Sequence, residues 1–280
     1  MSNKFFPCLW QNGTGKQAAE LYSKAFGDTV IISDNGMVVM IEISGCKVML
    51  LNGGPIFTPN PSISLFVTFD NEKSIDAAWQ KLSDGGKVMM ALDKYPWSDK
   101  YGWLEDQFGV SWQLILTKPG MKEQKIMPAL MFTQSVAGKS EEAMKLYTSL
   151  FPNSSIEHIS RYEKGEGDVE GTVKHGRFLL DGQMFASMDS SMAHAFTFSE
   201  GVSISVNCDT QEEIDTYWNA LTADGGQESM CGWLKDKYGV SWQIVPSMLG
   251  SILSNPENGQ RAMQALMQMK KLEIDKLVNA

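Results

Sequence analysis

Four segments of the chain repeat their apolar residues at the spacing of an amphipathic helix. In each segment apolar side chains recur at i, i+3, i+4 and i+7, which places them along one side of a helix. Thr14 with Gln17, and Thr210 with Glu213, have the spacing of a capping box at a helix start. The pattern predicts helices at Ala18–Phe26, Ile75–Leu82, Ala143–Phe151 and Ile214–Leu221.

Short apolar runs of strand character surround each predicted helix. FFPCLW, SISLFVTF, IMPALMF and GVSISVNC precede the helices, and runs such as MVVMIEI and CKVMLL follow them. The pattern therefore predicts four consecutive βαβββ units. Because the apolar side of a helix needs a sheet face to cover it, these units indicate an α+β layered fold.

The segment GWLEDQFGVSWQLI at Gly102–Ile115 recurs as GWLKDKYGVSWQIV at Gly232–Val245. The copies lie 130 residues apart and agree at nine of fourteen positions. Two further pairs of matching blocks occur in the same order, so the chain is a tandem repeat. We predict domains at 1–120 and 125–250, a polar linker at Thr117–Lys125, and a helical tail at 251–280.

Charge and composition narrow the classes of partner. A formal net charge of −9 argues against nucleic acid and against an anionic membrane surface, since both favour a basic protein surface. No apolar run approaches the ~20 residues of a membrane span, and the first residues, MSNKFFPCLW, contain no apolar signal-peptide core. The four cysteines show no CxxC spacing. We expect reduced thiols in a cytoplasmic protein.

Several of these blocks resemble a known superfamily. FFPCLWQNG, AAELYSKAFG, YPWSDKYGWLEDQFGVSWQLI and CGWLKDKYGVSWQIVP are similar to the PhnB-like branch of the vicinal oxygen chelate (glyoxalase/bleomycin-resistance) superfamily. This branch is also labelled 3-demethylubiquinone-9 3-methyltransferase-like. The resemblance covers about residues 1–250 and implies a tandem two-domain form. It implies two cup-shaped mixed sheets with helices outside and any site inside the cup, and it implies no single reaction.

Metal-using members of this superfamily hold their ion with His and Glu side chains at strand ends. The glutamate of the last strand is replaced here by Gln113, and in the second copy by Gln243. A neutral amide is a poorer ligand for a transition metal than a carboxylate. Ser64 and Ser203 stand where the resemblance places another ligand. We therefore predict no metal.

Histidines and nucleotide motifs add no further site. The first repeat contains no histidine, and His158, His175 and His194 are widely spaced in the second. We expect these three at the solvent or at sheet edges. The chain also lacks GxGxxG, so S-adenosylmethionine is not expected, and we predict no cofactor.

The predicted cups are suited to a small organic ligand. Trp112 and Gln113 point to opposite faces of one strand, so Trp112 and its copy Trp242 are predicted in the core beneath the helices. Gln113 and Gln243 either tie down their neighbours or donate to a ligand. Aromatic side chains with polar edges suit a mostly apolar pocket. The candidate ligand-binding residues are Trp10, Ser64, Trp97, Tyr101, Trp103, Gln113, Ser203, Trp233 and Gln243.

The two copies differ in their connections. The first keeps KVMMALDKYPWSDKYGW before its motif, whereas the second has only QESMCGW and lacks most of a hairpin. The second gains the Gly-rich loop Glu163–Gly176, whose acidic residues argue against phosphate binding. In the tail, Ala262, Leu266 and Met269 lie on one side of a helix, which predicts packing on the second domain or on a partner chain.

Three functions stay open from the sequence. The first is a metal-free protein that binds a small organic molecule. The second is an enzyme of the vicinal oxygen chelate type (lyase, dioxygenase or transferase), metal-free or with unorthodox ligands such as Asp189 or Glu42. The third is a structural or interaction protein whose own side chains fill the cups. No catalytic residue is predicted, enzymatic activity stays uncertain, and both a monomer with internal domain pairing and a homodimer are compatible.

Overall fold

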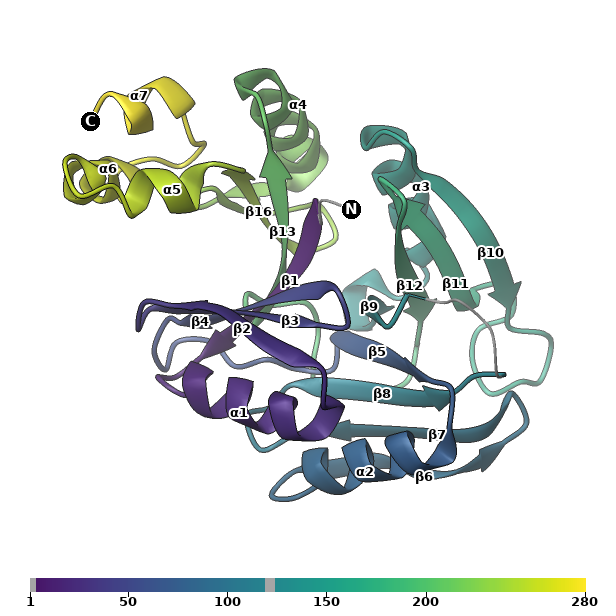
Figure 1. The fold of residues 1–280 in the computed structure, drawn as a ribbon. Coiled ribbons are helices and arrows are strands. Elements are labelled where there is room, and N and C mark those ends of the chain that lie inside the picture. The colour runs from purple at the N-terminus through teal and green to yellow at the C-terminus, as the bar shows by residue number, and fades with distance from the viewer. Residues whose placement is uncertain (1–3, 119–123) are drawn as a thin grey trace. The chain divides into compact units, whose positions relative to one another are not determined.

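A computed structural model describes residues 4–118 and 124–280 of the chain (Figure 1). Its contacts divide the chain into two compact units: Pro7–Val202, and the residues up to Phe6 together with Ser203–Ala280. The predicted domain bounds follow the sequence repeats instead, and they stay a prediction. Residues 119–123 of the predicted linker lie outside the described residues.

One eight-stranded sheet lies wholly within the larger unit. In spatial order its strands are β10 (Ser155–Arg161), β11 (Val173–Leu180), β12 (Gln183–Asp189), β9 (Ile126–Phe132), β5 (Ile63–Phe69), β8 (Ser111–Leu116), β7 (Ser98–Glu105) and β6 (Lys87–Tyr95). At its centre β5 and β9 run antiparallel, with Ser64 opposite Ala129. β8 is parallel to β5, and β12 is parallel to β9. The two sequence repeats therefore meet within one mixed sheet.

The remaining strands form one group in each unit. In the larger unit β1 (Phe5–Gln11), β4 (Cys46–Asn52), β3 (Val38–Ile43) and β2 (Thr29–Asp34) follow one another. In the smaller unit the order is β14 (Gln227–Glu228), β15 (Trp233–Lys235), β16 (Ser241–Pro246) and β13 (Val202–Cys208). There the N–H of Asn207 donates to the carbonyl of Lys4 at 2.9 Å. Both sheets are mixed and packed against helices, which confirms the predicted α+β fold.

The four predicted helices form, and each buries its apolar side. They are α1 (Gly15–Phe26), α2 (Glu72–Leu82), α3 (Ser140–Leu150) and α4 (Gln211–Thr222). Thr210 accepts from the N–H of Glu213 at 3.2 Å and caps α4 as predicted. The capping box predicted at Thr14 is wrong. The Thr14 hydroxyl donates to Gln11, and Asn52 of β4 accepts from the first N–H of α1 instead.

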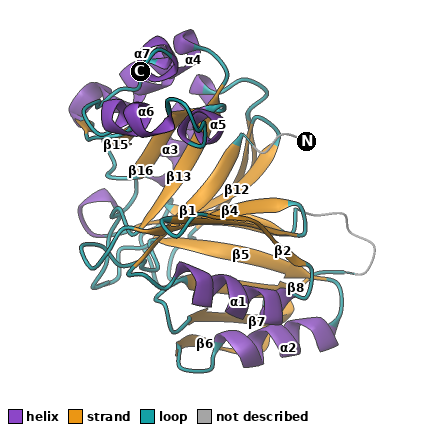
Figure 2. Ribbon diagram, turned by 60° about the vertical axis from the view of Figure 1, so that its left-hand side comes forward, coloured by secondary structure: helices purple, strands orange, loops and turns teal. Residues whose placement is uncertain are grey.

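The helix α2 packs on β5, β7 and β8, whereas α1 packs on β2, β3 and β4 and lies against α2. Figures 1 and 2 show α1 and α2 lying side by side. The rings of Tyr22 and Phe26 on α1 contact Trp112 of β8, with centroids 4.9 and 5.1 Å away. Trp112 is fully buried, as predicted for the face beneath the helices.

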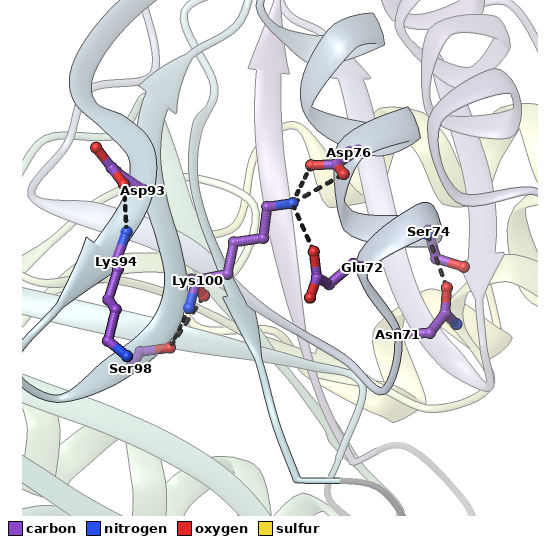
Figure 3. A network of polar contacts seen from close by, with 8 residues as sticks. All are labelled: Asn71, Glu72, Ser74, Asp76, Asp93, Lys94, Ser98 and Lys100. Carbon is purple, nitrogen blue, oxygen red and sulfur yellow. Dashed lines mark hydrogen bonds and ion pairs between the residues drawn. The ribbon is translucent and has the colours of Figure 1, made fainter.

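The hairpin of β6 and β7 is tied to α2 by an ionic contact. Figure 3 shows the Lys100 side chain of β7 reaching Glu72 and Asp76 on α2. The Lys100 ammonium lies 2.6 Å from Asp76 and 3.5 Å from Glu72. At the start of the same helix, Asn71 accepts from the N–H of Ser74 at 2.8 Å. These contacts fix the hairpin beside β8.

The tail consists of three short helices rather than one. They are α5 (Leu249–Leu253), α6 (Gly259–Leu266) and α7 (Ile274–Val278). Pro256 lies between the first two, and the chain then turns at Met269–Lys270 so that Leu272 and Leu277 pack with Val245 of β16. The 3-10 turns η1 (Gln134–Val136) and η2 (Ala223–Gly225) complete the helical elements of the described residues, none of which is long and apolar enough to span a bilayer.

Candidate functional site

The side of the repeated motif that faces the helices is a hydrogen-bonded core. Trp112 Nε1 donates to Asp106 Oδ2 at 2.8 Å, and the Tyr22 hydroxyl donates to the same oxygen at 2.9 Å. In the second copy Trp242 Nε1 donates to Asp236 Oδ2 at 2.9 Å. Both indoles are buried, which confirms the prediction of Trp112 and Trp242 as core residues. This half of the motif maintains the fold.

Gln113 lies on the opposite face of β8. The Tyr101 hydroxyl of β7 donates to Gln113 Oε1 at 2.8 Å. Burial raises the pKa of Tyr101, and nearby Tyr95 raises it further, so the hydroxyl stays protonated and remains a donor. Within the described residues the Gln113 amide nitrogen has no hydrogen-bond partner. Gln113 is buried, with 3% of its surface exposed, but its amide nitrogen is not among the fully buried unpaired side-chain atoms of the described residues, which belong to Gln11, Ser205, Ser241 and Asn258.

A second polar chain lies beside Gln113 on the same face. Trp103 Nε1 donates to the Ser111 hydroxyl at 2.8 Å, and that hydroxyl lies 3.0 Å from the hydroxyl of Ser64. Trp103 is directly opposite Gln113 across β7 and β8. The indole and both serines are therefore held by one another, which leaves the Gln113 amide as the donor that is open on this face.

Aromatic rings border the Gln113 amide. Trp97, in the turn between β6 and β7, stacks on Tyr95 at 5.0 Å and meets Tyr101 edge to face at 5.9 Å. Phe66 of β5 lies 6.4 Å from Tyr101. Although it is packed against two rings, the Trp97 side chain is 59% exposed. This wall offers aromatic surface to solvent on the side of the sheet that carries Gln113.

Methionines continue the same face beyond Phe66. Phe66 is opposite Gln113 on β8 and opposite Met127 on β9. An apolar cluster follows across β9 and β12, made of Met127, Ala129 and Ala186 with Phe66, Met184 and Met188 packed on it. Unbranched thioether side chains adapt to ligands of different shape. The face thus combines one amide, an aromatic wall and an adaptable apolar floor.

The remaining candidate residues lie elsewhere. Trp10 is on β1, where its Nε1 donates to the Gly54 carbonyl at 2.7 Å and its ring meets Phe57 edge to face. In the smaller unit Gln243 Nε2 donates to the Ser203 hydroxyl at 2.9 Å, and Trp233 is opposite Gln243 across β15 and β16. The structure therefore brings together Ser64, Trp97, Tyr101, Trp103 and Gln113 on one face.

Two histidines, His158 and His175, lie on the adjacent strands β10 and β11. His158 is exposed on the edge strand β10, as expected. His175 is half-buried on the inner strand β11, so the expectation of a solvent or edge position is wrong for it. Burial lowers the pKa of His175, and the charges of Arg177 and His158 lower it further. The alternation of His175 and Arg177 with buried Phe178 in VKHGRFLL was the signal that could have revealed this placement.

The strand positions at which the family resemblance would place metal ligands carry side chains that do not suit a metal. Ser64 and Ala129 are opposite each other at the sheet centre, and Gln113 is committed to Tyr101. Asp189, a suggested unorthodox ligand, instead accepts hydrogen bonds from the backbone N–H groups of Gly138, Ser140 and Val173 at 2.8 to 3.0 Å. Glu42 is opposite Lys47 across β3 and β4. Within residues 4–118 and 124–280 no three His, Cys, Asp or Glu side chains gather around one point.

Comparison with known proteins identifies a matching family and a similar fold. It matches the family model described as 3-demethylubiquinone-9 3-methyltransferase over residues 3–115 and 124–245. The PhnB protein from Bacillus cereus is 32% identical over 40% of this chain and 98% of its own, with a TM-score of 0.38. Glyoxalase I from Zea mays is 11% identical over 87% of this chain and 94% of its own, with a TM-score of 0.58. That similarity concerns the fold alone. No curated protein matches the chain.

Proposed function

This chain belongs to the 3-demethylubiquinone-9 3-methyltransferase family and its fold is similar to that of glyoxalase I, and we propose that it binds a small organic molecule without a metal. The proposed ligand site lies on the sheet that contains β5, β7, β8 and β9. It is the face that carries Gln113 and Tyr101, with Trp97 beside it. We name it the Gln113 face. The ligand is a neutral or weakly polar molecule with an aromatic or other apolar part.

The observation that carries the proposal is the oriented amide of Gln113. The Tyr101 hydroxyl holds Oε1 at 2.8 Å, so the amide nitrogen is turned away from Tyr101 and has no hydrogen-bond partner among the described residues. Polar side chains in such a position are nearly always paired with protein, water or ligand. A carbonyl, ether or phenolic oxygen on a ligand is the acceptor that two amide hydrogens suit.

The surroundings of the amide support an apolar body for the ligand. The ring wall of Tyr95, Trp97 and Tyr101 offers stacking, and the methionine floor offers adaptable contact. Small-molecule sites commonly combine apolar walls with a few fixed polar groups that set the orientation. The described residues that line the Gln113 face, as named above, carry no charged side chain, which favours a ligand of low charge.

The metal-free part of the proposal rests on the chemistry of the side chains. The cup positions hold hydroxyl, methyl and amide groups at Ser64, Ala129 and Gln113. Transition metals prefer imidazole, thiolate and carboxylate. The family description names a methyl transfer, but the chain has no GxGxxG segment to receive the methyl donor. Binding is therefore proposed in preference to turnover.

A paired-variant ligand screen tests the proposal. Thermal unfolding of the native chain is recorded against a library of small aromatic carbonyl and phenolic compounds, since a ligand present at 100 times its Kd stabilises by about 2.7 kcal/mol. A true ligand should lose its effect in Gln113→Leu and keep it in the matched variant Gln243→Leu. Equal loss in both variants, or loss in Gln243→Leu alone, would place binding elsewhere.

Elemental analysis tests the metal-free part separately. Protein purified without chelator and without a metal-affinity tag should contain well below one equivalent of Zn, Fe, Ni or Mn per chain. One equivalent that disappears in Gln113→Ala would overturn the metal-free proposal and favour an enzyme.

A further inference from the structure

Three sulfur-bearing side chains meet where the tail packs on the second copy of the motif. They are Cys231, two residues before β15, Met263 within α6, and Met267 directly after that helix. The Cys231 Sγ lies 3.8 Å from Met267 Sδ. Cys231 and Met263 both pack against the apolar cluster that contains Leu266 and Leu272. We name Cys231, Met263 and Met267 the sulfur cluster.

Main-chain hydrogen bonds hold the members of the sulfur cluster beside one another. The N–H of Cys231 donates to the carbonyl of Met269 at 2.7 Å, which fixes the cysteine against the tail. The N–H of Met267 donates to the carbonyl of Met263 at 3.1 Å and continues the helical turn. Residues four apart in a helix lie on one side of it, so both thioethers project from the same side of α6.

The spacing of the sulfur atoms suits a single soft metal ion. Thiolate and thioether sulfur are the ligands that select Cu(I). Two sulfurs that each lie about 2.3 Å from one ion, at a tetrahedral angle, are about 3.8 Å apart. Cys231 Sγ and Met267 Sδ are separated by 3.8 Å, so one ion can join them with little movement of either side chain. Met263 supplies a third sulfur, because an unbranched methionine adapts its conformation readily.

The sulfur cluster is within reach of an ion in solution. Met267 is 61% exposed, and Cys231 and Met263 are half-buried. Zinc and iron sites require several imidazole, thiolate or carboxylate ligands. In the part of the chain that the structure describes, no three His, Cys, Asp or Glu side chains gather around one point, so the cluster is not a site for those metals. Its one thiolate and two thioethers favour copper in the +1 state.

We propose that the sulfur cluster binds one Cu(I) ion, with the thiolate of Cys231 and the thioethers of Met267 and Met263 as ligands. On binding, the Cys231 thiol releases its proton to solvent, and the copper keeps its +1 state. Burial raises the pKa of Cys231, so the ion displaces a proton and binding strengthens as the pH rises. This site shares no residue with the Gln113 face and is independent of the organic ligand proposed there.

Competition with bicinchoninate, a chelator that forms a coloured complex with Cu(I), tests the site. Without oxygen, the full chain should withdraw one equivalent of Cu(I) from the chelator, and an equal amount of Zn²⁺ should not displace it. Cys231→Ser and Met267→Leu should each raise the Kd for Cu(I) at least about tenfold. Leucine keeps the volume and apolar character of methionine, so Met267→Leu without copper should unfold close to the native temperature.

The matched controls change a cysteine and a methionine of the larger unit. Cys46 is a half-buried free cysteine and Met192 is 64% exposed, so Cys46→Ser and Met192→Leu should bind Cu(I) like the native chain. For the native chain, the Kd should fall about tenfold for each rise of one pH unit below the pKa of the thiol, since one proton is released. Failure to withdraw copper from the chelator would overturn the proposal. Equal affinity of Met267→Leu and the native chain would overturn it as well, and so would an equal loss in the control variants.

Discussion

In the first copy of the repeated motif, Asp106 accepts hydrogen bonds from Trp112 and from the N–H groups of Phe108 and Val110. In the second copy Asp236 accepts the corresponding three, from Trp242 and from the N–H groups of Tyr238 and Val240. One buried carboxylate closes the same tight turn in both places and anchors an indole under the helices. The identical residues of the motif are explained by this shared structural task.

The opposite face of the motif differs between the copies. Gln113 accepts from Tyr101 and keeps its amide donors open, whereas Gln243 donates to Ser203. The residue that corresponds to Tyr101 in the second copy is Cys231, which cannot orient the glutamine in the same way. Sequence identity at the glutamine therefore conceals two different hydrogen-bond roles. Only the first copy presents an oriented amide.

The copies also complete their sheets with different segments of chain. In the first copy Gly102 lies against Leu92 of the hairpin strand β6. In the second copy Gly232 lies against Leu272 of the tail, and the N–H groups of Cys231 and Gly232 donate to the carbonyls of Met269 and Lys270. The tail thus lies where the first copy continues its hairpin strand, of which the second copy keeps only the two-residue β14. The two copies therefore share one core and differ in the chain segments that pack around it.

The largest expected effect comes from removing the tail's contact with the second copy. Leu272 is fully buried, so Leu272→Ala should cost about 2–5 kcal/mol of unfolding free energy through lost burial and a residual cavity. Leu92→Ala should cost less, because Leu92 is only half-buried on β6. Urea unfolding of both variants measures the difference. An equal or smaller loss for Leu272→Ala would mean that the tail does not substitute for the hairpin.

The next effect concerns the carboxylates that the copies share. In Asp106→Asn and Asp236→Asn the amide oxygen can still serve the backbone donors, but the amide nitrogen then faces the indole N–H. Each variant should lose about 1–3 kcal/mol for the buried donor left unpaired. Urea titration followed by tryptophan fluorescence tests both. A loss at one position with none at the other would show that the copies do not share this structural role.

A smaller effect is expected where the copies differ. Tyr101→Phe removes the hydroxyl that holds Gln113 Oε1, so the affinity of a ligand from the screen should fall about fivefold to tenfold, or about 1 kcal/mol. Isothermal titration measures this change. Ser203→Ala, which removes the partner of Gln243, should leave the affinity unchanged. Weaker binding in Ser203→Ala than in Tyr101→Phe would assign the ligand to the second copy.

The local part of this structure was accessible from the sequence. Helical spacing predicted the four helices, and strand alternation correctly separated buried Trp112 from Gln113 on the opposite face. The family resemblance predicted the paired βαβββ fold. These features depend on neighbours two to four residues apart, which a single sequence displays directly.

The features that were missed depend on partners far apart in the chain. The pairing of β5 with β9 joins the two repeats within one sheet, and nothing in either strand alone specifies its neighbour. The tie from Tyr101 to Gln113 requires the register of β7 on β8. The hydrogen bond from the Cys231 N–H to the Met269 carbonyl joins the second copy of the motif to the tail. Periodicity cannot identify such partners, because it reports which face a residue occupies and not what lies across from it.

The smallest expected effect is an ion pair that only the second repeat has. Glu141 of α3 lies 2.7 Å from Arg161 and 2.9 Å from Lys145, whereas the corresponding position of α1 is Lys16. Hydrogen bonds from Arg161 and Lys145 lower the pKa of Glu141 from 4.5 to about 2.

The stabilising contribution of the Glu141 carboxylate is therefore fully present above pH 4.5 and is lost as the pH falls through about 2. Because the pair is largely exposed, Glu141→Gln should lower the unfolding temperature only slightly at pH 6, less so in high salt, and progressively less as the pH falls toward 2. Thermal unfolding from pH 2 to 6 tests this, with Glu20→Gln on α1 as the control, since Glu20 has no ion pair within the described residues. An unchanged difference between the native chain and Glu141→Gln across that range would show that the pair does not distinguish the second repeat energetically.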